Sequence, residues 1–99
     1  FKKSQVSEVI SLCQAFHWAH GKPVHVGDPK GIGINNIYNP DWGDKPRKLL
    51  EDEVNVFWAC GVTPQNAILT SDIAFCVSHT PGHMLITDIK ENAETPILQ

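Results

Sequence analysis

Two short apolar runs joined by helix signals place the strongest constraint on the fold of this chain. Residues 54–60 are too few for an ordinary helix and rich in residues that favour strands, and they end at Gly61. Thr63 can then cap a short helix over residues 64–69, whose first residue is a proline. Residues 73–77 form the second apolar run, so we expect a strand, a short crossover helix and another strand.

The order of these elements predicts where a ligand would bind. If the strands at 54–60 and 73–77 are parallel neighbours, the right-handed crossover rule puts the turn at residues 61–63 at the carboxyl edge of the sheet, where α/β folds bind ligands. The turn residues 80–82 lie near that same edge and precede a hairpin strand expected at 84–89. We therefore predict an α/β fold, with α+β as the alternative, built on a small mixed, partly parallel sheet.

The rest of the chain divides into three further parts. Apolar residues at helical spacing predict an amphipathic helix within residues 1–17. Residues 18–53 hold a minimal strand around His25 and a long loop rich in Gly, Asn, Pro and Asp. After the strand, helix, strand and hairpin of residues 54–89, the tail at 90–99 is expected to fray.

The length of the chain limits its organisation. Ninety-nine residues suffice for one domain at most. The chain begins at Phe1 and its only methionine is Met84, so we expect a processed chain or an excised part of a larger protein. The rest of that parent chain would then be a partner of this region.

Composition excludes two classes of partner. Lys and Arg total 8 against 11 Asp and Glu, for a formal net charge of −3, so nucleic acid is not expected. The apolar runs are far shorter than the roughly 20 residues of a membrane span, so a membrane is not expected either. Cys13, Cys60 and Cys76 are odd in number and lack C-x-x-C spacing, which predicts buried, reduced thiols in an intracellular compartment.

Two histidines flank a tight turn. His79 and His83 stand at the two ends of Thr-Pro-Gly, so their imidazoles could converge on one ligand. A zinc ion would need a third ligand, which His25, Asp28 or Cys60 could supply. The spacing indicates a metal only weakly, because zinc sites of the H-x-x-x-H type depend on a helix that Pro and Gly forbid here. For either histidine alone, a hydrogen bond to the backbone is the simpler role.

The segment from Cys60 to Pro64 stands where a strand end meets a helix start. The N-terminus of a helix presents unpaired N–H groups and a positive dipole, so this turn could hold a carboxylate or lower the pKa of a nearby thiol. The simpler interpretation is that Thr63 caps the helix while Cys60 packs as a small apolar residue. At the end of the strand around His25, the imidazole of His25 and the carboxylate of Asp28 could act as an acid/base pair. Asp28 before a proline is equally typical of an ordinary turn.

Four sequence blocks go beyond a generic α/β segment. They read PVHVGDPKGIGI, PDWGD, VFWACGVTPQNAI and SHTPGHMLITD. In this order and spacing they resemble the hydro-lyase family that includes the amino-terminal region of mitochondrial D-glutamate cyclase. The resemblance runs from about residue 16 to residue 89 and corresponds to the carboxyl-terminal part of that family's domain. Lys22 and Asn66 are minor departures from the pattern.

The resemblance implies a lyase that closes D-glutamate to 5-oxo-D-proline with loss of water. It implies a mixed α/β fold and a small-molecule carboxylate substrate. Independently of the resemblance, we expect no cofactor and no bound metal. The expected setting is the mitochondrial matrix if the source is eukaryotic, and the cytoplasm otherwise.

Such a ring closure needs a base for the amine, an acid for the departing oxygen and a pocket for the α-carboxylate. We assign His79 and His83 as the acid/base pair, with Asp28 orienting one imidazole or acting as the base. The pocket is assigned to backbone N–H groups and a hydroxyl at the turn after the first apolar run. The residues assigned to substrate binding are Cys60, Gly61, Thr63, Thr80 and His25.

Two other functions stand beside this one. The same turn could capture an acidic metabolite without chemistry and support an enzyme domain elsewhere in the parent chain. Alternatively, His25, His79 and His83 could build a metal-dependent hydrolase.

Overall fold

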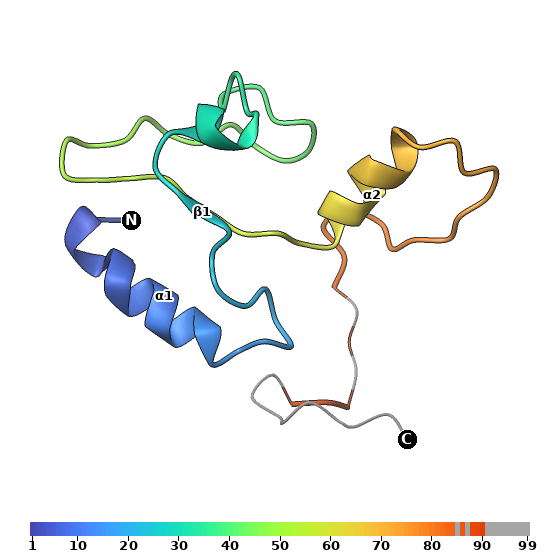
Figure 1. The fold of residues 1–99 in the computed structure, drawn as a ribbon, viewed down its shortest axis with the longest axis horizontal. Helices are drawn as coiled ribbons and strands as arrows, with labels where there is room; N and C mark the ends of the chain where they lie inside the picture. Colours follow the sequence, from blue (N-terminus) through green and yellow to red (C-terminus); the bar gives the residue numbers. More distant parts are fainter. Residues whose placement is uncertain (85, 87, 91–99) are drawn as a thin grey trace.

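The structure is a computed structural model that describes residues 1–84, 86 and 88–90. It is a mixed α/β arrangement, in agreement with the predicted class (Figure 1). The frayed tail predicted at 90–99 lies outside the described residues except for Lys90, and so does part of the strand predicted at 84–89. In chain order the elements are η1 (Lys3–Gln5), α1 (Val6–Gln14), β1 (His25–Val26), η2 (Pro29–Ile32), β2 (Val56–Phe57) and α2 (Val62–Leu69).

Helix α1 forms where the apolar spacing predicts it, although it is shorter. Glu8 lies in its first turn, where the helix dipole favours a carboxylate. The helix ends at Gln14 because the chain tightens there, with the Phe16 amide bonded to the Cys13 carbonyl at 3.1 Å. The half-buried residues of α1 share one face at the spacing of an amphipathic helix: Val6, Val9, Ile10 and Cys13.

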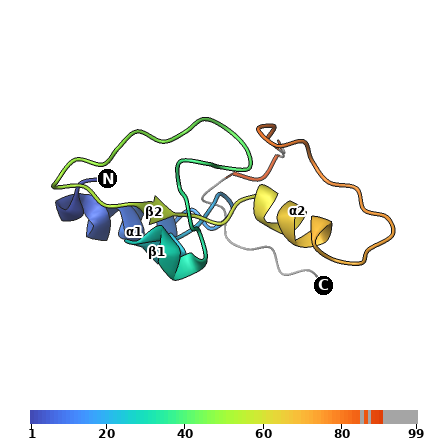
Figure 2. The same ribbon diagram turned by 90° about the horizontal axis from the view of Figure 1, so that it is seen from above.

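The sheet is a single antiparallel pair, β1 with β2. His25 lies opposite Phe57 and Val26 opposite Val56. The pairing extends beyond the two strands, because the Val24 amide donates to the Phe57 carbonyl at 2.8 Å. The amino-terminal residues line up beside the same segment through a bridge between Lys2 and Glu53. Figure 2 shows β1, β2 and α1 gathered together, with α2 standing apart from them.

The partly parallel arrangement predicted for this sheet is wrong. Residues 73–77 form no strand, and Phe75 and Val77 are 82% and 81% exposed. An apolar run becomes a strand only when a neighbouring strand accepts and donates its backbone hydrogen bonds. In the described part of the chain, β2 takes that pairing from β1, which precedes it by some thirty residues.

Trp58 ties the turn after α1 to the sheet. Its indole Nε1 donates to the Gly21 carbonyl at 3.1 Å, across 37 residues of sequence. The ring also packs beside Phe1, with 5.8 Å between ring centroids. Gly21 has a φ of 64°, a left-handed conformation that glycine adopts without strain, so the chain can reverse here and enter β1. This contact fixes the turn at residues 16–21 next to the end of β2.

The side chains in the described part of the chain are only partly shielded from solvent. No described residue is fully buried, and the longest half-buried run is residues 53–58, around β2. Within the same residues, no helix combines the length and the apolar character needed to cross a bilayer.

The long loop predicted before β2 is present and ends on an ion pair. After η2 the chain has no regular element until β2. Arg47 donates through its two terminal nitrogens to the Glu53 carboxylate at 2.7 and 2.6 Å, and the Leu50 amide donates to the same carboxylate at 2.9 Å. These hydrogen bonds, with the guanidinium charge, lower the pKa of Glu53 from 4.5 to about 2. Arg47 therefore ties the end of the loop to the residue that precedes β2 by three positions, Glu53.

The pair predicts how stability depends on pH. Because the pKa of Glu53 is lower in the folded state, the pair stabilises the fold above about pH 4.5 and loses this effect as the pH falls towards 2. We expect Glu53→Gln to lower the midpoint of thermal unfolding at pH 7 and to converge with the unsubstituted protein near pH 2. Asp52→Asn is the control, because its pair with Lys2 is 3.9 Å long and about 60% exposed on each side. A pH-independent difference for Glu53→Gln would contradict this account.

A second prediction concerns the indole of Trp58. Trp58→Phe keeps an aromatic ring and removes the N–H that binds Gly21, so we expect a loss of about 1 kcal/mol in the free energy of unfolding. Trp42→Phe makes the same change on the exposed loop and should alter stability by less than about 0.5 kcal/mol. Urea unfolding followed by circular dichroism measures both. Equal losses in the two variants would refute the role given to Trp58.

Candidate functional site

An open cleft lies between the turn after α1 and the turn that joins β2 to α2. Its volume is about 350 Å³. Three of the residues assigned to substrate binding from the sequence, Cys60, Gly61 and Thr63, are on one wall. The full lining is Ala19, His20, Ala59, Cys60, Gly61, Thr63 and Pro64.

The start of α2 differs from the prediction. The helix begins at Val62 with Gly61 as its N-cap residue, so Pro64 lies inside the first turn. Proline is tolerated throughout that turn because its missing N–H has no intrahelical partner there, so it does not mark one starting residue. The Thr63 hydroxyl does not cap the helix but accepts a hydrogen bond from the Cys60 amide at 3.2 Å.

This local geometry decides which groups of the turn could bind an anion. The Thr63 amide is already bonded to the Cys60 carbonyl at 3.0 Å, and Pro64 has no N–H. The first N–H groups of a helix have no intrahelical acceptor. The amides at Gly61 and Val62 are therefore the candidate donors to a carboxylate, while the Thr63 hydroxyl can still donate its proton.

His79 lies directly against the turn. A side-chain carbon built at Gly61 would collide with His79 Nε2 and come within 2.8 Å of Cε1, so the ring keeps this position only beside a glycine. The Gln65 side chain donates to the His79 carbonyl at 2.6 Å and holds this segment beside α2. The ring's Nδ1 donates to the Thr80 carbonyl at 2.9 Å, which leaves Nε2 as the unprotonated nitrogen of the neutral imidazole.

His83 and Thr80 form hydrogen bonds within the turn at residues 80–83. The His83 amide donates to the Thr80 carbonyl at 3.1 Å, and His83 Nδ1 donates to the Pro81 carbonyl at 3.3 Å. The described structure therefore gives His83 the backbone-bonding role that was its simpler interpretation. Neither His83 nor Thr80 lines the cleft.

At the junction of β1 and η2, the side chains of His25 and Asp28 both form hydrogen bonds to the main chain. His25 Nε2 donates to the main-chain carbonyl of Asp28 at 2.8 Å, and its ring packs beside Phe57. The Asp28 carboxylate accepts from the Lys30 amide at 3.0 Å and so caps η2. The structure thus places Asp28 in ordinary turn chemistry, and neither residue lines the cleft.

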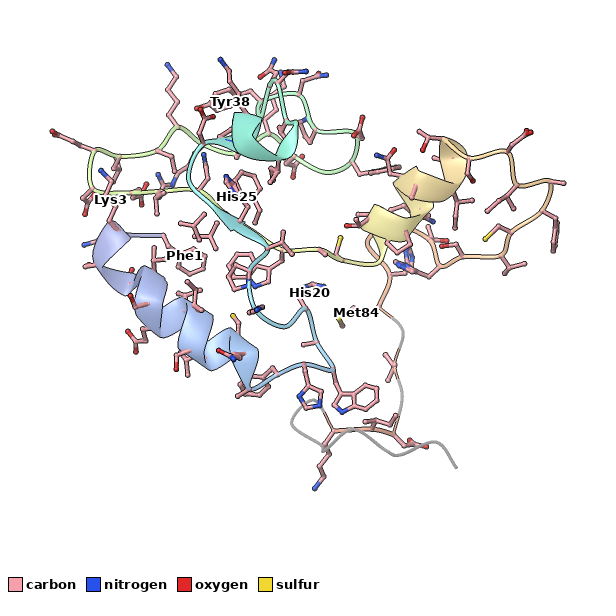
Figure 3. The ribbon with its side chains drawn as sticks, in the orientation of Figure 1. Phe1, Lys3, His20, His25, Tyr38 and Met84 are labelled. Carbon is pink, nitrogen blue, oxygen red and sulfur yellow. The ribbon has the colours of Figure 1, made fainter. Side chains whose placement is uncertain are left out.

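His20 is the residue of this site that sequence reasoning missed. It lines the cleft opposite Cys60 and also a neighbouring cavity of about 420 Å³. Figure 3 shows its side chain projecting from the turn after α1 towards the segment between β2 and α2. No motif marks His20, and the only local signal is its place just before the Gly-Lys-Pro stop. The neighbouring cavity is lined by Leu12, Cys13, Phe16, Ala19, His20, Gly21 and Trp58.

The cysteines differ in part from their prediction. All three are free thiols, but Cys13 and Cys60 are half-buried and Cys76 is exposed. The prediction of three buried thiols is wrong because the apolar run that contains Cys76 has no strand partner in the described residues. The described residues likewise contain no group of three or more His, Cys, Asp or Glu placed to hold a metal ion.

Comparison with known proteins identifies relatives of the whole region. A family model described as D-glutamate cyclase matches residues 1–88. A protein of Dinoroseobacter shibae named "putative hydro-lyase" is 52% identical over 97 residues, which is 98% of this chain and 32% of that protein. Proteins with the same name from Acinetobacter baylyi and Ruegeria pomeroyi are 50% and 52% identical, over 91% and 98% of this chain and 33% and 35% of their own lengths. The chain therefore spans about a third of the length of these curated relatives.

The contact between Gly61 and His79 gives a direct test of the site's geometry. The φ of Gly61 is −60°, which alanine adopts freely, so Gly61→Ala adds only a methyl group that the imidazole must avoid. In protein with ¹³C-labelled histidine, we expect this variant to shift the His79 ring resonance and to leave that of His25 in place.

Gly31→Ala is the matched control. A side-chain carbon at Gly31 would meet His25 Cε1 at 3.0 Å, so this variant should move the His25 resonance and spare His79. If Gly61→Ala leaves the His79 resonance unmoved, the ring does not lie against the turn.

Proposed function

Because this chain belongs to the D-glutamate cyclase family, we propose that it forms part of a hydro-lyase that closes D-glutamate to 5-oxo-D-proline and water. The observation that carries the proposal is the cleft at the start of α2, which Cys60, Gly61 and Thr63 line together with His20, while His79 lies outside this lining. His20 faces these residues across the cleft, and His79 packs against Gly61. We further propose that the chain is a single-domain part of a longer protein, whose other residues are its partner.

The reaction defines what this site must supply. The substrate nitrogen attacks the γ-carboxyl carbon, so a C–N bond forms and a C–O bond breaks. The ammonium loses two protons in becoming the lactam N–H, and they leave with the departing oxygen as water. The site therefore needs a group that accepts a proton near nitrogen and one that donates a proton near oxygen.

The turn before α2 suits the carboxylate that does not react. The amides at Gly61 and Val62 and the hydroxyl of Thr63 can donate to it, and the positive end of the helix dipole favours its charge. Holding this carboxylate fixes the substrate and brings nitrogen and carbon together, which lowers the entropic part of the barrier.

His79 is the first candidate for acid/base work. Its Nδ1 is fixed by the Thr80 carbonyl and its Nε2 lies against Gly61, so the ring must turn away from Gly61 before Nε2 can accept a proton from a substrate. His83 and Asp28, the other residues proposed from the sequence, hydrogen-bond within their own turns and would have to leave these bonds to act on a substrate.

The proposed setting is the cytoplasm of a bacterial cell. The three relatives named above are bacterial, and this finding gives no support to the mitochondrial matrix. The free thiols agree with a reducing compartment.

A proton NMR time course of D-glutamate and 5-oxo-D-proline, with the full-length protein that carries this chain, tests the reaction. We expect conversion by the unsubstituted protein and a fall in kcat of about a hundredfold or more in His79→Gln, since a positioned acid/base group contributes at least that factor. Comparison with His83→Gln and Asp28→Asn shows whether these residues share the role.

The outcomes separate the candidate functions. Binding of 5-oxo-D-proline without any conversion of D-glutamate would favour the metabolite-binding module instead. Full activity in the combined His79→Gln, His83→Gln variant would refute the assignment of either imidazole to catalysis.

A further inference from the structure

The five histidines of the chain differ in what their rings contact. The rings of His25, His79 and His83 each bond to a nearby main-chain carbonyl, at 2.8, 2.9 and 3.3 Å. His17 packs its ring beside the indole that follows it, with 5.7 Å between centroids. The His20 ring forms no hydrogen bond or ion pair with any residue that the structure describes. Both of its nitrogens are therefore available to a ligand.

The backbone beneath His20 is nevertheless held firmly. The Ala19 and Gly21 amides both donate to the Phe16 carbonyl, at 3.0 and 3.3 Å. The Gly21 carbonyl in turn accepts from the Trp58 indole at 3.1 Å. Hydrogen bonds on both sides of His20 therefore fix the position of its backbone.

His20 stands where two cavities meet. On one side are the thiol, the glycine and the hydroxyl of the turn before α2: Cys60, Gly61 and Thr63. On the other side the wall is apolar, with Leu12, Phe16 and Trp58. A carboxylate held at the turn would place the rest of a small substrate in front of this imidazole.

We infer that His20 is a second catalytic acid/base group of this site, a step that rests on the proposed function and extends it. His20 takes a proton from the substrate ammonium, so that the nitrogen can attack the γ-carboxyl carbon. As the C–N bond forms and the C–O bond breaks, the imidazolium returns a proton to the departing oxygen, which leaves as water. His79, which packs against Gly61, takes the second proton of the ammonium and passes it to the same oxygen, so that both protons leave with it as water.

Few other titratable groups lie near His20 among the described residues. In the described part of the chain, the other titratable groups that line the two cavities are the thiols of Cys13 and Cys60. No carboxylate or cationic side chain lines either cavity there. A pH effect that is lost with His20, kept in Cys13→Ala and partly restored to His20→Ala by added imidazole can therefore be assigned to the His20 ring.

The test uses the full-length protein, with D-glutamate as substrate and rates measured across the pH range in which histidine titrates. We expect His20→Gln to lower kcat by about a hundredfold or more with little change in KM, and to lose one limb of the pH profile. Imidazole added to His20→Ala should restore part of the rate, since the position is exposed. His17→Gln, three residues earlier on the same turn and outside both cavities, should keep the rate and the profile.

Three results would overturn the inference, and they differ from one another. No conversion by the unsubstituted protein removes the proposed function and the role of His20 with it. Conversion with an unchanged rate and pH profile in His20→Gln removes His20 alone. A lower rate with an unchanged pH profile and no rescue by imidazole assigns His20 a structural role, provided circular dichroism shows that the variant folds.

Discussion

The antiparallel pairing of β1 with β2 is the interaction on which the rest of this structure depends. The strands are two residues long, yet they join segments more than thirty residues apart. Trp58 extends the pairing by one more contact, because its indole binds the carbonyl of Gly21. Together with the bridge between Lys2 and Glu53, these bonds hold the turn after α1 beside the start of α2. The cleft exists because both turns are attached to the same pair of strands.

This dependence also explains how much of the fold the sequence could predict. Helix α1 and both strands follow local patterns, and these patterns were sufficient to place them. The partner of β2 is a non-local choice that an apolar run does not encode, and the parallel partner at 73–77 was wrong for that reason. The start of α2 moved by two residues because a proline fits anywhere in a first turn.

The residues of the candidate site also differ in whether the sequence could predict them. Cys60, Gly61 and Thr63 could be found because a strand end next to a helix start is visible in the sequence, and the structure gathers them on one wall. His20 could not be found, because it comes to the cleft through two non-local interactions, the pairing of β1 with β2 and the contact between Trp58 and Gly21. Histidine spacing suggested that His83 would join His79, but the carbonyls of a tight turn bind both rings locally.

The close approach of His79 to Gly61 has an evolutionary consequence. An imidazole at position 79 fills the space that any side chain at position 61 would need, so the two features exclude each other in this conformation. Substitutions at the two positions are therefore coupled. A lineage that replaces the glycine must also lose the histidine or turn its ring away from position 61, and the second change moves the imidazole out of its present place.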